Sequence, residues 1–222
     1  VALIFDYESA FMWETQPQGA DFDYFRLVFE TYRALRRTGL NIDVIAPDAD
    51  LTGYGATFAP GLAVPRNLST ATGKLVLGPR AFAKTENFQI PMPLPPGLPG
   101  LAVSHVESLP PSLTLAVEGG GTITRWVDRL EVGDAAEIIW QITDGSPALV
   151  RSANMHYLAG WLDREGLARL IGELGLPNAQ LPRGLRRRTL GDGTAVMTNY
   201  SATTESWNGR SYAPASVTFE AP

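Results

Sequence analysis

The sequence contains no cysteine and only two histidines among its 222 residues. Without cysteine the chain has no disulfide, no thiolate metal site, no iron–sulfur cluster and no cysteine nucleophile. His105 and His156 stand too far apart in the sequence to suggest a histidine-rich metal site, and each is expected to be structural. We therefore expect no metal and no other cofactor.

Positive charge is also limited, because 18 lysines and arginines stand against 23 aspartates and glutamates and give a net charge of -5. A chain with this net charge has no overall positive potential that would attract nucleic-acid phosphates or an anionic membrane. No apolar run approaches the roughly 18 to 20 residues of a membrane span, and no signal peptide is recognised. We expect a cytoplasmic protein that binds neither nucleic acid nor a membrane.

Phosphate-binding motifs are missing as well. Neither G-x-G-x-x-G nor G-x-x-x-x-G-K-[ST] follows a predicted strand, so we expect no flavin or nucleotide site. An eight-fold β/α barrel takes about 250 residues, so it does not fit beside a second domain. The chain opens on Val1 without a Met, inside a predicted strand, and we expect it to be a piece of a longer protein.

The first part of the sequence predicts a β-loop-α-β unit. The apolar run Val1 to Phe5 suits a strand of a parallel sheet, and a loop of about fifteen residues is expected after it. Asp21 is predicted to cap a helix that extends to Arg37, and residues 41–45 form the second strand. The predicted buried stripe of this helix consists of Phe22, Phe25, Val28, Phe29, Tyr32 and Leu35.

The alternation of strands and helices predicts an α/β fold with an open, mostly parallel sheet flanked by helices. Residues 78–100 are rich in proline and are expected to form an extended arm. A small antiparallel β-domain is expected at residues 183–222, after a first domain of residues 1–180. Further strands are predicted at residues 56–59, 74–77, 103–106, 113–117, 122–130, 137–142, 148–151, 155–159, 185–188, 195–200 and 216–219, with a helix at 163–175.

The loop after the first strand is the first candidate site, because function in a parallel sheet gathers at the carboxyl ends of its strands. Asp6, Glu8 and Glu14 offer carboxylates of the kind that glycoside hydrolysis uses in pairs. The alternative is a loop that docks on another domain or subunit. Its buried anchors would be Phe11, Met12 and Trp13.

The segment after residue 77 offers a second candidate region. Arg80 stands where some related folds place a nucleophile, but neither Ser nor Cys is present there, so amidotransferase chemistry is excluded. Arg80, Lys84 and Glu86 are expected to form a salt network or to bind an acidic partner. Phe88, in the proline-rich arm, is expected to reach across a subunit boundary. The basic cluster at Arg183, Arg186, Arg187 and Arg188 is expected to be a solvated surface or to pair with acidic groups.

Several segments together resemble a known family. The segments are FDYESAFMWETQPQGADFDYF (5–25), YRALRRTGLNIDVIAPDADLTGY (32–54), LVLGPRAFAKTENFQIP (75–91), VESLPP (106–111), HYLAGW (156–161) and LPRGLRRR (181–188). They are similar to the trimerisation domain of glycoside hydrolase family 42 β-galactosidases and to the small β-domain after it. The resemblance covers essentially the whole chain.

The resemblance implies a fold and a role. Members of the family carry an N-terminal barrel with the catalytic glutamates, then a flavodoxin-like or class I glutamine amidotransferase-like domain, then a small β-domain. This chain resembles the second and third, so the resemblance implies no catalytic residue here. It implies a homotrimer and a catalytic barrel as partner in cis or in trans, in a parent enzyme that hydrolyses terminal β-D-galactosides with retention.

Two other functions remain open on the sequence. The chain could be an independent hydrolase that uses Asp6, Glu8 or Glu14, although no comparable loop supplies a second acidic cluster. It could also be a carbohydrate-binding module, because flat aromatic side chains stack on sugars. The candidate platforms are Trp13, Trp126, Trp140, Trp161 and Trp207.

Overall fold

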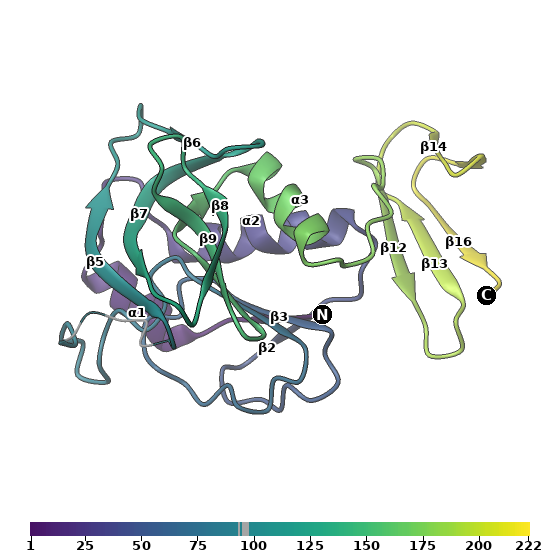
Figure 1. Cartoon of the computed structure of the whole chain (residues 1–222). Helices are drawn as coiled ribbons and strands as arrows, with labels where there is room; N and C mark the ends of the chain where they lie inside the picture. Colours follow the sequence, from purple (N-terminus) through teal and green to yellow (C-terminus); the bar gives the residue numbers. More distant parts are fainter. Residues whose placement is uncertain (93, 95–97) are drawn as a thin grey trace.

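The computed structural model describes residues 1–92, 94 and 98–222 (Figure 1). The helices of the described chain are α1 (Tyr7–Thr15), α2 (Tyr24–Arg37) and α3 (Arg164–Glu173). Its strands are β1 (Ala2–Ile4), β2 (Asp43–Ile45), β3 (Ala56–Ala59), β4 (Lys74–Leu77), β5 (Leu101–Ser108), β6 (Leu115–Ala116), β7 (Thr122–Val132), β8 (Glu137–Gln141), β9 (Pro147–Ser152), β10 (Met155–Leu158), β11 (Gly160–Leu162), β12 (Leu185–Thr189), β13 (Ala195–Asn199), β14 (Glu205–Trp207), β15 (Arg210–Tyr212) and β16 (Ser216–Glu220).

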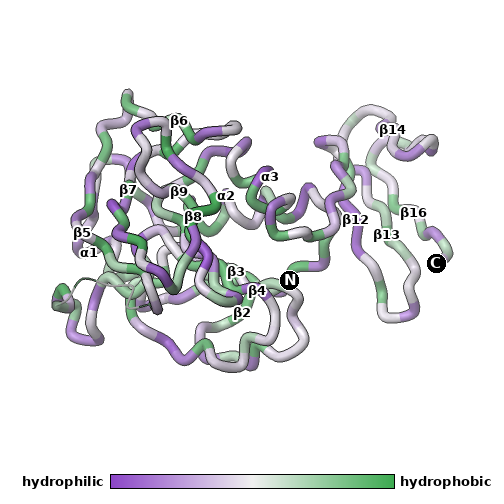
Figure 2. The backbone as a smooth tube through the Cα atoms, viewed as in Figure 1, coloured by the Kyte–Doolittle hydropathy of each residue, from purple (hydrophilic) through white to green (hydrophobic). Residues whose placement is uncertain are grey.

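The main sheet has seven strands in the order β2-β1-β3-β4-β10-β9-β8. The first five of these run parallel, whereas β9 and β8 add to the edge as antiparallel strands. Strands β1, β3 and β4 consist almost wholly of buried residues, as a sheet covered on both faces requires. The predicted mixed α/β fold with a mostly parallel sheet is therefore confirmed, and the hydrophobic residues of its central strands are visible in Figure 2.

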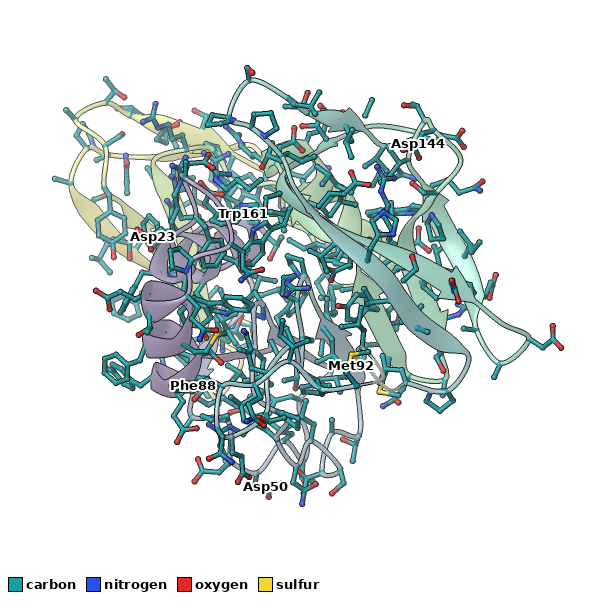
Figure 3. All side chains as sticks on the ribbon, turned by 90° about the vertical axis from the view of Figure 1, so that its left-hand side faces the viewer. Asp23, Asp50, Phe88, Met92, Asp144 and Trp161 are labelled. Atoms are coloured by element: carbon teal, nitrogen blue, oxygen red, sulfur yellow. The ribbon has the colours of Figure 1, made fainter. Side chains whose placement is uncertain are left out.

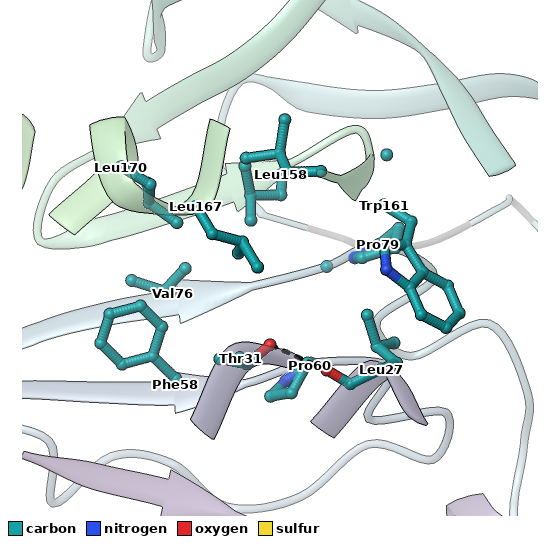
Figure 4. A pocket seen from close by; sticks show the side chains of 13 residues that line it. Leu27, Thr31, Phe58, Pro60, Val76, Pro79, Leu158, Trp161, Leu167 and Leu170 are labelled. Atoms are coloured by element: carbon teal, nitrogen blue, oxygen red, sulfur yellow. Dashed lines mark hydrogen bonds between the residues drawn. The ribbon is translucent and has the colours of Figure 1, made fainter. Parts of the chain in front are cut away.

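Helices α2 and α3 pack against each other and against this sheet (Figure 4). Leu27 and Thr31 of α2 meet Leu167 and Leu170 of α3 across a small cavity of about 20 Å³ floored by strands β3 and β4. That volume is close to the space of one water molecule. The apolar contact of the two helices with strands β3 and β4 is therefore closely packed.

A second sheet, β11-β7-β5 with β6 paired to β7, packs beside the main one. Its long strand β7 pairs with β5, β6 and β11, all antiparallel. Trp126 of β7 stacks on Phe22, with ring centroids 3.8 Å apart, and lies 4.9 Å from the ring of Trp13. This aromatic cluster joins the N-terminal segment to the second sheet.

Several elements differ from the sequence-based prediction. Strands β11, β14 and β15 were not predicted, and two differences lie in the N-terminal part. The prediction of a fifteen-residue loop is wrong, because residues 7–15 form α1. The backbone amides of Glu8 and Ser9, in its first turn, donate hydrogen bonds to the side chain of Asp6. The helix predicted from Asp21 starts two residues later. Its cap is Asp23, because the Asp21 carboxylate instead lies 3.2 Å from the guanidinium of Arg125.

The predicted buried stripe of α2 is also wrong in part. Phe25 and Phe29 are 57% and 55% exposed, although Val28 and Leu35 are buried as predicted. The face that packs inward is rotated, because Phe25 and Phe29, four residues apart, fall on a different line of the helix surface from the buried set. The buried residues of α2 are Tyr24, Leu27, Val28, Thr31 and Leu35.

The C-terminal segment forms the three-stranded sheet β12-β13-β16 and the hairpin β14-β15. Its own core is small and contains Leu181, Leu185, Met197 and Tyr212. The segment contacts the end of α2 and the residues after it. The backbone amide of Leu181 donates to the Arg37 carbonyl at 3.0 Å, and the side-chain amide of Asn41 donates to the Thr189 carbonyl at 2.6 Å. Such contacts supply stability that about forty residues cannot reach alone.

Candidate functional site

Asp6 and Glu8, the first two candidate carboxylates, are held by one arginine. Asp6 is buried, and besides capping α1 it accepts a hydrogen bond from the Ser9 hydroxyl at 2.6 Å. Arg66 donates to Asp6 at 3.3 Å and also pairs with Glu8. Burial alone would lower the pKa of Arg66, but the bond to Glu8 and the charge of Asp6 raise it. Asp6 therefore has a structural role, because it caps the first turn of α1 and pairs with Arg66.

Glu14, the third candidate carboxylate, lies in a separate environment. It lines an open cleft of about 290 Å³ between α1 and the start of α2. Asp23 is the other carboxylate of this cleft, and the remaining lining residues are Ala10, Trp13, Phe22, Tyr24 and Phe25. The structure therefore places Glu14 outside the network that Arg66 forms with Asp6 and Glu8.

Met12 and Trp13, two of the three expected docking anchors, are buried within this chain. They are 0% and 1% exposed, and the Trp13 indole donates to the Gly61 carbonyl at 2.8 Å. The expectation that they anchor a neighbour is therefore wrong, because the helix that replaces the predicted loop turns them inward. Phe11 points the other way and is 59% exposed.

Exposed aromatic side chains from α1 and α2 form a continuous surface. The Phe5 ring lies 4.9 Å from Tyr7 and 5.3 Å from Phe25, and Tyr7 lies 6.4 Å from Phe11. We call this surface the aromatic face, and its exposed members are Tyr7, Phe11, Phe25 and Phe29. This face was not predicted from the sequence, because the predicted core included Phe25 and Phe29 and the predicted loop included Tyr7.

The candidate sugar-stacking tryptophans offer no open platform. Trp13, Trp126, Trp140 and Trp161 are all at most 3% exposed, and Figure 3 shows Trp161 inside the fold. Trp207 is half-buried, and its indole donates to the Ala179 carbonyl at 2.8 Å. Burial of these rings argues against the carbohydrate-binding module.

Arg80, at the turn after β4, belongs to a buried polar group that the structure assembles. Its guanidinium lies 3.5 Å from the Asp128 carboxylate, to which the Tyr157 hydroxyl donates at 2.7 Å. Burial raises the pKa of Asp128, while the charge of Arg80 opposes that change. The sequence signal for Asp128 was available, because it lies two residues from the buried Trp126 and Leu130 and so shares their face of β7.

The other residues expected to join Arg80 lie apart from it. Lys84 is buried and donates to Gln16 at 2.6 Å, and burial together with the nearby Arg80 charge lowers the pKa of Lys84. Glu86 is exposed and makes no ion pair with the part of the chain that the structure describes. Arg80, Lys84 and Glu86 therefore form no common salt network within the described chain, and a network or an acidic partner at an interface stays a prediction.

The proline-rich arm presents part of its apolar surface to solvent. Phe88 is half-buried with φ +59°, whereas Ile90 and Met92 are 59% and 83% exposed (Figure 3). The expected reach of this arm depends also on residues 93 and 95–97, which lie outside the described residues.

The described residues contain neither a metal-binding cluster nor a membrane-spanning helix. No group of three or more His, Asp or Glu side chains in them could hold a metal ion. None of the helices of residues 1–92, 94 and 98–222 has the length and apolar character needed to cross a membrane.

Comparison with known proteins identifies relatives. The chain is 41% identical over 210 residues to a β-galactosidase of Thermus thermophilus, and this match covers 86% of the chain but 32% of the relative. A β-galactosidase from Halorubrum lacusprofundi is 32% identical over 242 residues. The chain therefore spans about a third of the length of these curated relatives.

Solved structures agree with this result. The fold matches a β-galactosidase from the psychrophilic Marinomonas ef1 with a TM-score of 0.88 at 29% identity, covering 98% of this chain and 37% of that one. The β-galactosidase structure from Halorubrum lacusprofundi gives a TM-score of 0.88 at 28% identity and covers 100% and 39%. The family model of the β-galactosidase trimerisation domain matches residues 1–182. The resemblance drawn from the sequence is thus confirmed, and the chain belongs to the β-galactosidase trimerisation domain family.

Proposed function

We propose that this chain is the self-association region of a longer β-galactosidase and carries out no catalysis itself. Its association state would be a homotrimer, and its partner a catalytic barrel in cis or in trans. The parent enzyme would hydrolyse terminal β-D-galactosides with retention. Family membership and the threefold greater length of the curated relatives support this reading.

The aromatic face is the single observation that carries the proposal. Its four exposed aromatic side chains lie on α1 and α2 and are each more than half exposed. The Phe5 ring links Tyr7 to Phe25, and Phe29 follows Phe25 by about one helical turn. A contiguous apolar patch of this kind marks a protein–protein contact, because solvating it is costly. Aromatic side chains are also enriched at the energetically dominant positions of interfaces.

The same proposal includes a finer fold class and a domain division. The order β2-β1-β3-β4-β10 has the pattern of a flavodoxin-like sheet, which supports a flavodoxin-like or amidotransferase-like fold. We divide the chain at residues 1–180 and 183–222. Separate hydrophobic clusters for the two parts support that division.

Sedimentation velocity of the 222-residue chain at several concentrations tests the association. Wild type should approach the mass of three copies as concentration rises. A Phe25→Ser/Phe29→Ser variant should associate more weakly. Phe219→Ser is the matched control, because Phe219 is 67% exposed on β16, away from the aromatic face, and it should behave as wild type. A wild-type chain that stays monomeric at high concentration contradicts the proposal.

A nitrophenyl galactoside assay tests the absence of catalysis. The chain should show no turnover, because Asp6 and Glu8 are tied to Arg66 and Glu14 lies apart from them. Turnover that is lost in Glu8→Gln or Glu14→Gln would instead establish an independent hydrolase.

A further inference from the structure

Arginines without an acidic partner gather at one place in the fold. The place is the junction of the second half of α2, the start of α3 and β12, at the centre right of Figure 1. We call this group the arginine cluster, and its members are Arg33, Arg36, Arg37, Arg164 and Arg186. None of them has a carboxylate oxygen within 4.0 Å among the described residues, and the arginines in ion pairs are Arg26, Arg66, Arg80, Arg125, Arg129, Arg151 and Arg210.

Three members of the arginine cluster line a pocket. Arg33 and Arg37 from α2 and Arg164 from α3 border a space of about 90 Å³, together with Ala34 and Leu167. Its remaining lining residue is an acid, Glu30.

Glu30 offsets only part of this positive charge, because its one ion pair in the described chain is with Arg26 and not with Arg33, Arg37 or Arg164. One of its oxygens accepts from Arg26 at 2.9 Å, and the other accepts from the indole of Trp161 at 2.8 Å. The pocket therefore has three guanidiniums against one carboxylate that is bonded elsewhere. Its net charge is positive in a chain whose overall charge is -5.

The C-terminal segment adds to this positive field. The backbone hydrogen bond from Leu181 to Arg37 holds β12 beside the end of α2, near Arg36, and β12 carries Arg186. Burial lowers the pKa of Arg186, and the nearby charges of Arg36 and Arg33 lower it further. Like charges gathered without counter-charges destabilise a fold, and a bound anion would remove that cost.

We propose that this pocket binds an oxyanion, either a phosphate or a carboxylate group, held by Arg33, Arg37 and Arg164. A guanidinium offers a planar fork of donors that matches both groups with two parallel hydrogen bonds. The pocket has room for one such group. Arg36 and Arg186 strengthen the field without lining the pocket. The proposal does not depend on self-association.

Thermal unfolding of the 222-residue chain tests this with three salts at matched ionic strength. Sodium phosphate and sodium acetate are compared with sodium chloride, and titration calorimetry gives the affinity for phosphate. A saturable rise in Tm with phosphate, with acetate or with both, beyond the effect of chloride, supports the site and identifies which oxyanion it takes. Equal effects of the three salts overturn the proposal.

Variants separate a pocket from general surface charge. Arg37→Gln and Arg164→Gln should each weaken the oxyanion about tenfold or more, since each removes a charge-assisted pairing. Arg188→Gln is the matched control, because Arg188 is exposed and does not line the pocket, and it should leave the affinity unchanged. An equal loss in all three variants overturns the proposal in favour of nonspecific attraction.

The sign of the Tm change gives a second, independent readout. In low salt without an oxyanion, Arg37→Gln should raise Tm, because it relieves repulsion within the arginine cluster. With saturating phosphate the order should reverse, because wild type gains stability from binding that the variant lacks. A variant whose Tm lies below that of wild type by the same amount in both conditions contradicts the site, since it would show a purely structural role for Arg37.

Discussion

The Arg80 guanidinium lies 3.5 Å from the Asp128 carboxylate, and the Arg80 backbone amide donates to the same carboxylate at 3.0 Å. Asp128 thus holds both the side chain and the main chain of the turn after β4. Arg80 has φ +63°, a conformation that non-glycine residues adopt only when their surroundings fix it. The pair therefore joins the main sheet to β7 of the second sheet.

Removing this carboxylate should be strongly destabilising. Asp128→Asn leaves the Arg80 charge buried and unpaired, so we expect a loss of about 3 to 5 kcal/mol in the free energy of unfolding. Tyr157→Phe, which removes one hydrogen bond to the same group, should cost about 1 kcal/mol. Urea denaturation monitored by circular dichroism measures both. Equal losses in the two variants would show that the charge on Asp128 is unimportant.

The inward face of α2 gives a matched test. Leu35 is 0% exposed and Phe29 is 55% exposed on the same helix. Leu35→Ala should lower the free energy of unfolding by about 2 to 5 kcal/mol, whereas Phe29→Ala should stay within about 0.5 kcal/mol of wild type. The measurement is made at a concentration where the chain is monomeric. A large loss in the free energy of unfolding for Phe29→Ala would instead support the buried stripe that was predicted from the sequence.

Most strands were predictable because their signals are local, whereas the short strands β11, β14 and β15 were not predicted. Strands β3 and β4 were predicted with the bounds that the structure shows, because apolar runs flanked by turn residues define them. The stripe of α2 was not, because the helix carries more than one line of apolar residues and contacts with distant elements decide which line is buried. Periodicity fixes the spacing of a buried face, but it does not fix which line of residues turns inward.

The candidate site was less predictable for the same physical reason. Its long-range partners, such as Arg66 for Asp6 and Asp128 for Arg80, are set by the sheet order and leave no local signal. The cap of α1 did leave a local signal in the sequence, because Asp6 stands directly before the helix and Glu8 lies in its first turn. That signal was not used in the prediction, because the aromatic residues that follow Asp6 were interpreted as anchors of a docking loop.

Capping of α1 provides a third prediction. The Asp6 side chain accepts from two amides of the first turn and from the Ser9 hydroxyl. Asp6→Ala should therefore cost about 2 kcal/mol, the upper end for a helix cap. Asp50→Ala is the control, because the Asp50 side chain bonds only to Thr52 in an exposed turn. Amide hydrogen exchange of residues 7–15 should accelerate in Asp6→Ala alone, and unchanged exchange there contradicts the capping role.

The last prediction concerns acid stability and depends on Arg129. This arginine bridges Glu107 on β5 and Asp144 in the turn after β8, at 2.8 Å to each. Hydrogen bonds from Ser146, and then the bond and charge of Arg129, lower the pKa of Asp144 to about 2. The bond from Arg129 also lowers the pKa of Glu107.

The direction of the pH effect follows from these depressed values. An aspartate in the unfolded chain has a pKa of about 3.9, so the folded chain binds fewer protons than the unfolded chain in the window below that value. The stabilisation is therefore fully present above about pH 4 and is lost as the pH falls toward about 2. Both carboxylates are more than a third exposed, at 44% and 37%, so solvent screening limits the effect to less than about 1 kcal/mol for each pair.

Asp144→Asn should reduce the change in the free energy of unfolding between about pH 4 and about pH 2. The variant should be less stable than wild type at neutral pH, and the difference should shrink as the pH falls toward about 2, where Asp144 is increasingly protonated in wild type. Asp134→Asn is the control, because Asp134 is exposed and makes no ion pair within the described chain. Urea denaturation at a series of pH values gives the two difference curves. A constant difference between Asp144→Asn and wild type across the acid range would show that the carboxylate acts only through its shape and not through its charge.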